Sequence, residues 1–328
     1  MKKAIVTGGA GFIGSHMVEF LLKNGYEVIA VDDMSNGQLD NIELFKNHQS
    51  YDFKEIDVSQ PFNDLFFKNT DYVFHLAALA DIVPSIEHPD RYHEANVTGT
   101  VRVLETARKY NIKKFIYSAS SSCYGIPDTY PTSETADIRP EYPYALTKYI
   151  GEQYTMFWNK LYHLPVISLR YFNVFGTRAR SNNTYGAVFK VFLKQKLVGK
   201  PLTIVGDGTQ TRDFTYVSDI VRANFLAAQS DLEGEIFNVG TGNPQSINYL
   251  AECIGGETTH IPRRPGEPNS THADIGKIKK KLGWEPKVTF EQGINIMLDN
   301  IDYWKDAPLW TPKNIEKATK TWFKYLGK

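Results

Sequence analysis

A glycine-rich turn between the first strand pattern and the first helix pattern limits the folds open to this chain. Ala4 to Thr7 is a run of apolar and β-branched residues, which favours a strand, and Phe12 to Asn24 has helical apolar spacing. Gly8, Gly11 and Gly14 lie where the two patterns meet. Glycines at this spacing permit a tight turn and leave the first N–H groups of the helix open to a phosphate. The turn therefore predicts an α/β chain that carries a phosphate-containing ligand.

Strand and helix patterns continue to alternate through the N-terminal half, which predicts parallel strands joined by right-handed helical crossovers. We expect an α/β fold built on a doubly wound parallel sheet of the Rossmann type. A smaller C-terminal lobe follows, because the pattern becomes irregular after Tyr171. The expected strands are 27–32, 72–76, 114–118 and 165–170, and the expected helices are 94–110 and 144–161.

The same patterns suggest a division of the chain. We expect residues 1–172 to form the cofactor-binding domain, with about 214–243 returning to it, since Phe237 to Gly240 has a strand pattern. Residues 173–328 are expected to form mainly a substrate-binding lobe and a helical tail. Within the tail, Thr311 and Pro312 predict a helix start. Docking of this helix onto its own domain is the favoured interpretation, with a subunit contact or a pocket lid as the alternative.

A carboxylate at the end of the second strand indicates which dinucleotide the turn binds. Asp32 follows the glycine turn by about 20 residues, the separation at which an acidic side chain reaches a ribose 2′-hydroxyl. It would repel a 2′-phosphate, and no arginine stands immediately beside it. Gly8, Gly11, Phe12, Ile13, Gly14 and Asp32 are therefore candidate contacts to NAD rather than NADP. A plain strand-to-helix turn is the alternative.

Composition excludes several classes of partner. Lys plus Arg total 37 and Asp plus Glu total 37, so the formal net charge is zero and neither nucleic acid nor an anionic membrane is expected. No apolar run approaches the roughly 20 residues of a membrane span. Two cysteines make no disulfide framework, so we expect a cytoplasmic protein. The eight histidines lack metal-ligand spacing, and no metal site is predicted.

Tyr144 and Lys148 are candidates for acid-base chemistry. They are four residues apart in a helix pattern that Pro143 helps to begin, so they share one face. A phenol is a weak base near neutrality because its pKa is about 10. A nearby ammonium favours the phenolate and lowers that pKa. A surface pair on a helix is the alternative, but a serine-rich segment at 118–125 follows a strand pattern upstream and supports a reacting centre.

With these residues in view, the sequence resembles the extended short-chain dehydrogenase/reductase family, close to its UDP-sugar 4-epimerases. The resemblance extends to about Pro286. It rests on the segments 7–14, 75–78, 118–125, 144–148, 170–173, 212–213 and 264–274, together with Asn96.

The resemblance implies roles for individual residues. Ser120 would bind the reacting sugar oxygen beside Tyr144, and Lys148 would also reach the nicotinamide ribose. Tyr144 would take the proton of the sugar 4-hydroxyl while C4 gives hydride to NAD, and return of hydride to the other face of the 4-keto-sugar gives the C4 epimer. Further cofactor contacts implied in the same way are Asp57, Val58, Leu76, Ala77, Ala78 and Tyr171.

A nucleotide-diphosphate sugar needs arginines, and the resemblance places Arg212 and Arg264 at the diphosphate. The other substrate contacts it implies are Ser121, Asn173, Thr271 and Asp274, the last at the nucleoside ribose. Thr271 is small where the simple galactose epimerases often have a tyrosine, which predicts tolerance of 2-acetamido sugars. UDP is favoured by analogy, and guanine or thymine nucleotides remain alternatives.

Two other functions stay open at this point. The related 4,6-dehydratases carry a carboxylate where this chain has Ser121 or Ser122, so proton removal at C5 lacks its usual base unless another loop brings one. A non-catalytic NAD sensor is disfavoured by the intact Ser120, Tyr144 and Lys148. The helices expected at 94–110 and 144–161 correspond to those that pair two subunits in relatives, so a homodimer is expected.

Overall fold

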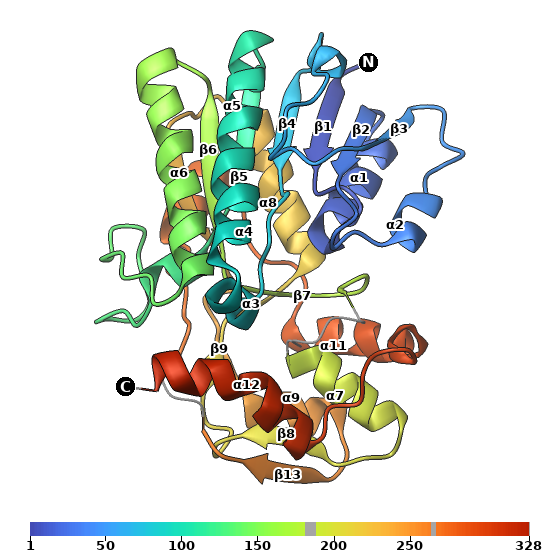
Figure 1. Cartoon of the computed structure of the whole chain (residues 1–328), viewed down its shortest axis with the longest axis vertical. Helices are drawn as coiled ribbons and strands as arrows, with labels where there is room; N and C mark the ends of the chain where they lie inside the picture. The colour runs from blue at the N-terminus through green and yellow to red at the C-terminus, as the bar shows by residue number, and fades with distance from the viewer. Residues whose placement is uncertain (181–187, 264–266, 328) are drawn as a thin grey trace.

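A parallel sheet of seven strands forms the centre of the upper lobe in Figure 1. The structure is a computed structural model, and it describes residues 1–180, 188–263 and 267–327. Every neighbouring pair in the sheet is parallel, and the strand order is β11-β6-β5-β4-β1-β2-β3. The strands are β1 Lys3–Thr7, β2 Glu27–Asp32, β3 Tyr51–Glu55, β4 Tyr72–His75, β5 Lys114–Ser120, β6 Val166–Tyr171 and β11 Glu235–Val239.

Helices cover both faces of this sheet, so its central strands are apolar on both sides. Ile5 of β1 packs with helices α5 and α6, whereas its neighbour Val6 packs with α1 and α8. This two-sided burial explains the continuous apolar runs that predicted the strands, and the doubly wound fold is confirmed. The helices of this lobe are α1 Phe12–Lys23, α2 Leu39–Glu43, α3 Ile82–Glu87, α4 Pro89–His93, α5 Gly99–Lys109, α6 Pro143–Tyr162, α8 Val217–Gln229 and α10 Gly276–Leu282.

Strand β3 was not expected from the sequence. It lies at the edge of the sheet and pairs only with β2. Asp52 and Lys54 alternate with partly buried aromatic residues along it, and the two form an exposed ion pair at 2.8 Å. An edge strand buries little of its surface, so its apolar signal is weak. The strand pattern near Phe237, by contrast, does return to the sheet, where β11 pairs with β6.

The chain reverses its winding between β1 and β4, which are neighbours in the sheet. From β1 the strands are added outward through β2 to β3, and the chain then crosses back to β4. Loops at the carboxyl ends of such a pair separate and leave a crevice for a ligand. The glycine turn follows β1 and the segment 76–80 follows β4, so both meet at this crevice.

A smaller lobe lies below the sheet (Figure 1). Its core is aromatic, and Phe175, Phe189, Phe214 and Phe290 contact one another there. The elements of this part are β7 Asn173–Phe175, α7 Val188–Leu197, β8 Leu202–Val205, β9 Thr211–Arg212, β10 Phe214–Tyr216, β12 Gln245–Ser246, α9 Ile247–Ile254, β13 Thr258–Ile261, α11 Phe290–Asp299 and α12 Pro312–Leu326. Thr311 caps α12, as its sequence predicts, by accepting the N–H of Asn314.

Candidate active site

The glycine turn has the close packing that a pyrophosphate site requires. Gly8 has a φ of +71°, and a Cβ on it would lie 2.8 Å from the backbone nitrogen of Ala77. A Cβ on Gly14 would lie 1.9 Å from the carbonyl oxygen of Gly8. Helix α1 begins at this turn and has no side-chain cap. Its first N–H groups and the positive end of its dipole are therefore available to a phosphate.

A groove of about 410 Å³ runs over this turn along the carboxyl edge of the sheet. Its shape and donors fit a dinucleotide: a glycine floor, a helix N-terminus, and a carboxylate at one end. The lining includes most of the predicted cofactor residues, namely Gly8, Gly11, Phe12, Ile13, Gly14, Asp32, Asp57, Val58, Leu76, Ala77 and Ala78.

Asp32 is buried at the end of β2, where its carboxylate accepts the N–H groups of Ala10 and Met34, each at 3.0 Å. Burial raises the pKa of this carboxyl to about 6. It is thus ionised at neutral pH and able to accept hydrogen bonds from ribose hydroxyls. Arg180 also lines the groove and donates to Asn36. Sequence reasoning missed this arginine, because only the fold brings residue 180 to the loop after β2.

Tyr144 lines a second cavity, of about 500 Å³, that lies between the two lobes. Ala80, Asp81, Val174 and Phe189 line both this cavity and the dinucleotide groove, so the two adjoin. Burial raises the pKa of Tyr144, and the hydrogen bond with Ser120 acts in the opposite direction. The phenol therefore lies where the dinucleotide and a substrate in the cavity would meet.

Lys148 is 3% exposed and departs from the expected arrangement. Its ammonium lies over the ring of Tyr117, 4.6 Å from the ring centre, on β5. Burial lowers the pKa of Lys148 to about 7, against the opposing charge of Glu152. The sequence predicted that this ammonium lowers the pKa of Tyr144. In this structure the hydrogen bond with Ser120 lowers the pKa of Tyr144, but burial raises this pKa by more.

The predicted substrate residues, together with the predicted cofactor contact Tyr171, fall into three groups. Ser121, Asn173, Arg212 and Thr271 line the cavity, and Ser120 lies directly before them on β5, in hydrogen-bond contact with Tyr144. Asp274 and Tyr171 line neither the cavity nor the groove. Arg264 lies outside the described residues.

The two residues outside the cavity have other partners. Asp274 accepts the N–H of Gly276 at 2.8 Å, at the start of α10. Tyr171 is buried in the core and donates to Asn224 at 2.9 Å. Both contacts are local or internal, and the sequence pattern does not separate such contacts from ligand contacts.

Hydrogen bonds fix the polar wall of the cavity. Arg212 is 8% exposed and pairs with Glu267 at 2.9 Å. Thr271 donates its hydroxyl to Asn173 Oδ1 at 2.7 Å and accepts the N–H of Asp213 at 3.0 Å. A diphosphate at Arg212 would therefore compete with the carboxylate of Glu267 for the guanidinium.

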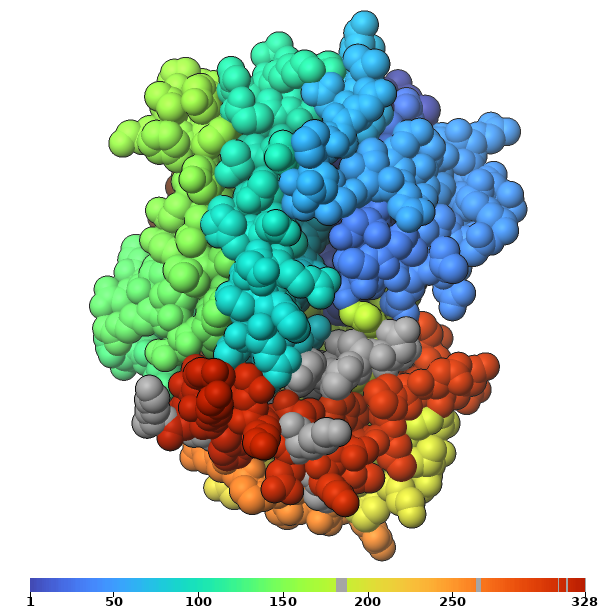
Figure 2. All heavy atoms as spheres, viewed as in Figure 1, coloured from blue at the N-terminus to red at the C-terminus, as the bar shows by residue number. Residues whose placement is uncertain are grey.

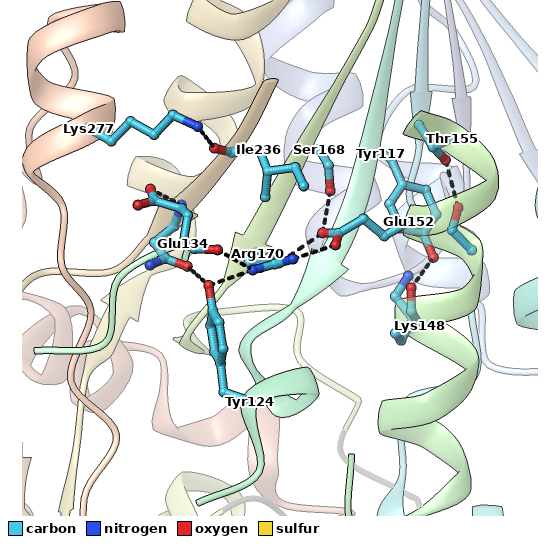
Figure 3. Close-up of polar contacts among 12 residues, drawn as sticks. Tyr117, Tyr124, Glu134, Lys148, Glu152, Thr155, Ser168, Arg170, Ile236 and Lys277 are labelled. Carbon is cyan, nitrogen blue, oxygen red and sulfur yellow. Dashed lines mark hydrogen bonds and ion pairs between the residues drawn. The ribbon is translucent and has the colours of Figure 1, made fainter. Parts of the chain in front are cut away.

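A buried ion pair anchors the helix that carries Tyr144 and Lys148 (Figure 3). Glu152 is one turn after Lys148 on α6 and is 1% exposed. Arg170 of β6 holds both of its carboxylate oxygens, through Nε at 2.9 Å and Nη2 at 2.6 Å. Ser168 donates to the same carboxylate at 2.9 Å. Both carboxylate oxygens therefore have partners on β6, and α6 is held in one position against the sheet.

The same arginine extends the network toward the cavity. Arg170 donates to the hydroxyl of Tyr124 at 2.8 Å (Figure 3). Tyr124 donates to Asn238 Oδ1 at 2.7 Å. Asn238 in turn donates to the carbonyl of Thr132 at 2.9 Å. Tyr124 belongs to the short 3-10 helix that follows Ser120. One network thus connects α6, which carries Tyr144, with residues 120–124, here called the serine turn.

Several cavity residues were not identified from the sequence. Tyr142 stacks on Tyr144, with ring centres 6.4 Å apart and planes 8° apart. Asp81 lies between the two cavities, and Trp322 reaches the substrate cavity from α12. Among the described residues, no group of three His, Cys, Asp or Glu side chains has metal-site geometry. No helix in the described ranges is long and apolar enough to cross a membrane.

Comparison with known proteins finds a matching family profile and relatives of similar length. Residues 4–240 match the profile of the "NAD dependent epimerase/dehydratase family". A "Putative UDP-glucose 4-epimerase" of Methanocaldococcus jannaschii is 38% identical over 297 residues, which cover 88% of this chain and 95% of that protein.

Two solved structures share both the fold and a third of the sequence. The UDP-N-acetylglucosamine 4-epimerase of Methanobrevibacter ruminantium, in complex with UDP-N-acetylmuramic acid, has a TM-score of 0.87 at 35% identity, covering 92% of this chain and 97% of its own. The UDP-glucuronic acid 4-epimerase of Bacillus cereus, in complex with UDP-glucuronic acid and NAD, has a TM-score of 0.85 at 33% identity, covering 92% and 99%.

We expect the raised pKa of Asp32 to make dinucleotide binding depend on pH. Below pH 6 the carboxyl takes up a proton and loses an acceptor, so NAD affinity should fall toward tenfold per pH unit. Calorimetric titration from pH 5 to 8 measures this. In Asp32→Asn the affinity should be lower throughout and the dependence should disappear, whereas Asp33→Asn should retain it. A dependence that persists in Asp32→Asn would assign it to another group.

Removal of Arg170 should destabilise the fold strongly. Arg170→Met leaves the carboxylate of Glu152 buried without its cation, which should lower the free energy of unfolding by about 3–5 kcal/mol. Urea denaturation followed by circular dichroism measures the loss. Glu152→Leu combined with Arg170→Met should recover much of it, and Lys54→Met in the exposed pair with Asp52 should change little. Equal stability of the single and double variants would contradict this assignment.

Proposed function

Because this chain belongs to the NAD dependent epimerase/dehydratase family, we propose that it interconverts the C4 epimers of a nucleotide-linked sugar through a transient 4-keto-sugar. The observation that carries the proposal is the position of Tyr144 where the dinucleotide groove adjoins a cavity lined by Arg212, Asn173 and Thr271. The two solved structures named above support it, since both are sugar-nucleotide 4-epimerases.

The cofactor is NAD, which supplies both the acceptor and the donor of the hydride. The chain contributes the binding and the orientation. We propose that the glycine turn and the start of α1 hold the pyrophosphate and that Asp32 holds the adenosine ribose. Asp57 and Val58 would lie along the adenine, and Leu76 to Ala78 would line the path toward the nicotinamide.

Tyr144 is proposed as the acid-base catalyst. The proton of the 4-hydroxyl passes to the phenolate oxygen while the electron pair of the C4–H bond leaves as hydride. Ser120 contacts Tyr144 and would hold the sugar oxygen between the two hydroxyls. Lys148 would favour the phenolate when it is charged and would reach the nicotinamide ribose. Return of hydride to the other face of C4, with the proton from Tyr144, completes epimerisation.

The substrate is proposed to be a UDP-sugar. Arg212 would bind the diphosphate, and Arg264 would join it. Asn173 and Ser121 would contact the sugar, and Thr271 leaves room beside C2 for an acetamido group. The Methanobrevibacter relative, a UDP-N-acetylglucosamine 4-epimerase, supports this substrate class. Asp274 remains a proposed ribose contact, and its observed bond to Gly276 would have to coexist with that role.

Epimerisation is favoured over 4,6-dehydration by the residues after Ser120. Ser121 and Ser122 line the cavity at the positions where a base for C5 is needed, and neither carries a carboxylate. Cys123 is also unsuited, because burial raises the pKa of its thiol to about 12.

We further propose that residues 1–172, joined by about 214–243, form the cofactor-binding domain and that 173–328 mainly bind the sugar nucleotide. The positions of α8 and β11 in the sheet lobe support this division, whereas β10, at the start of the returning segment, pairs with β7 in the smaller lobe. A cytoplasmic location is proposed because Cys123 and Cys253 form no disulfide.

Replacement of Tyr144 tests the function directly. The wild-type protein, incubated with UDP-, GDP- and dTDP-sugars, should interconvert C4 epimers of a UDP-sugar when products are followed by NMR. Tyr144→Phe should lower turnover by about 10²–10⁴-fold and keep NAD binding, because it removes the proton acceptor alone. Tyr154→Phe, at an exposed position of the same helix, is the control. Release of a 4-keto-6-deoxy sugar would identify a dehydratase instead.

A homodimer through α6 is also proposed. Leu146, Phe157 and Leu161 are exposed on this helix at 46%, 50% and 49%. Apolar side chains repeated along one helix are typical of a subunit contact. Sedimentation should show a dimer for the wild-type chain and a monomer for Leu161→Glu, whereas Leu65→Glu, at another exposed leucine, should remain dimeric. A monomeric wild-type protein would remove this proposal.

A further inference from the structure

Helix α12, at the end of the chain, connects the two lobes across the substrate cavity. Its first half belongs to the smaller lobe, because Ile315 is 5% exposed and packs in the aromatic core with Trp310. Gln195 of α7 donates to the carbonyl of Trp310 at 2.8 Å and secures the approach to the helix. The helix then extends toward the sheet lobe.

The second half of α12 contacts the sheet lobe. Thr321 donates its hydroxyl to Glu87 at the end of α3, at 2.7 Å. The ring of Trp322 lies 6.5 Å from the ring of Tyr142, at the start of α6. Figure 2 shows the red C-terminal helix beneath the sheet lobe and beside the spheres of the α3 region.

The buried face of α12 forms part of the cavity wall. Ile315, Ala318, Thr319 and Trp322 all line the cavity that contains Tyr144. Trp322 is 7% exposed, whereas its neighbour Phe323 is 43% exposed and faces away. Two ring contacts join Trp322 to the reacting phenol, since Tyr142 lies against both rings. The helix thus comes within one side chain of Tyr144.

We propose that α12 closes the substrate cavity and retains the 4-keto-sugar while it turns, with Trp322 and Tyr142 as the wall at the sugar end. The inference rests on the proposed epimerase function. An epimerase must hold an uncharged ketone that has lost its reacting hydroxyl and must present its other face to the same cofactor. A wall that spans both lobes excludes water and keeps the cleft closed while the 4-keto-sugar rotates.

Two of the solved neighbours cover a smaller share of this chain than of their own length. The Methanobrevibacter and Bacillus cereus structures match 97% and 99% of their own length but only 92% of this chain. Part of this chain therefore has no counterpart in them. Docking of the tail onto its own domain and closure of the pocket, which the sequence left as alternatives, are the same contact here.

Trp322→Ala and Phe323→Ala provide matched variants on one helix. Each 4-keto-sugar that escapes leaves one NADH behind, so leakage is measured as NADH formed per epimerisation event. Trp322→Ala should raise this ratio by about tenfold and should speed UDP dissociation severalfold in stopped-flow measurements. Phe323→Ala should match the wild type in both, and Trp322→Phe should restore most of the retention.

Each other outcome overturns the proposal or separates it from the epimerase function. If Trp322→Ala lowers thermal stability and turnover without added NADH or faster UDP release, α12 is a structural support only. If Trp322→Ala and Phe323→Ala behave alike in both measurements, Trp322 does not form the wall that retains the 4-keto-sugar. If the wild type epimerises no sugar nucleotide, the proposed function fails, and the UDP dissociation rates alone decide whether α12 closes the cavity.

Discussion

The buried pair between Glu152 and Arg170 is the interaction on which the geometry of the site depends. A buried ion pair is weak evidence for stability, because well-packed apolar residues of similar volume often stabilise a fold as well. Apolar residues, however, would not fix the orientation of α6 against the sheet. Arg170 binds both carboxylate oxygens and also Tyr124, so it sets the rotation of α6 and the position of the serine turn together. Tyr144 and Ser120 come from these two elements and must meet within hydrogen-bond distance.

Burial shifts the pKa values of the two proposed reacting groups in opposite directions. Burial raises the pKa of Tyr144 and lowers the pKa of Lys148 to about 7, so it acts toward the neutral form of each group. A neutral pair is the least costly arrangement in a cavity of low dielectric constant. The cost of the phenolate falls when a positive charge enters the groove, and the oxidised nicotinamide carries one. We therefore expect proton removal by Tyr144 to be coupled to the form of the cofactor that can accept hydride.

The parts of the site that lie close in sequence could be predicted, and the parts assembled by the fold could not. Gly8, Gly14 and Asp32 belong to a single strand-helix-strand unit, whose spacing determines their arrangement. Helical spacing placed Tyr144 and Lys148 on one face, but it did not reveal that Tyr117 draws the ammonium aside. The positions of Arg180, Tyr142 and Trp322 depend on contacts between distant segments, for which a single sequence has no local signal.

Closure of the cavity by α12 implies a compromise between retention and release. The same wall that holds an oxidised sugar also opposes the departure of the finished epimer, so tighter closure slows turnover when release is limiting. The contacts of α12 are suited to this compromise. Its first half is fixed in the aromatic core by Ile315, whereas its second half contacts the sheet lobe through the rings of Trp322 and Tyr142 and a hydrogen bond from Thr321 to Glu87. We therefore expect the second half of α12, which lies outside the aromatic core, to move when the product leaves.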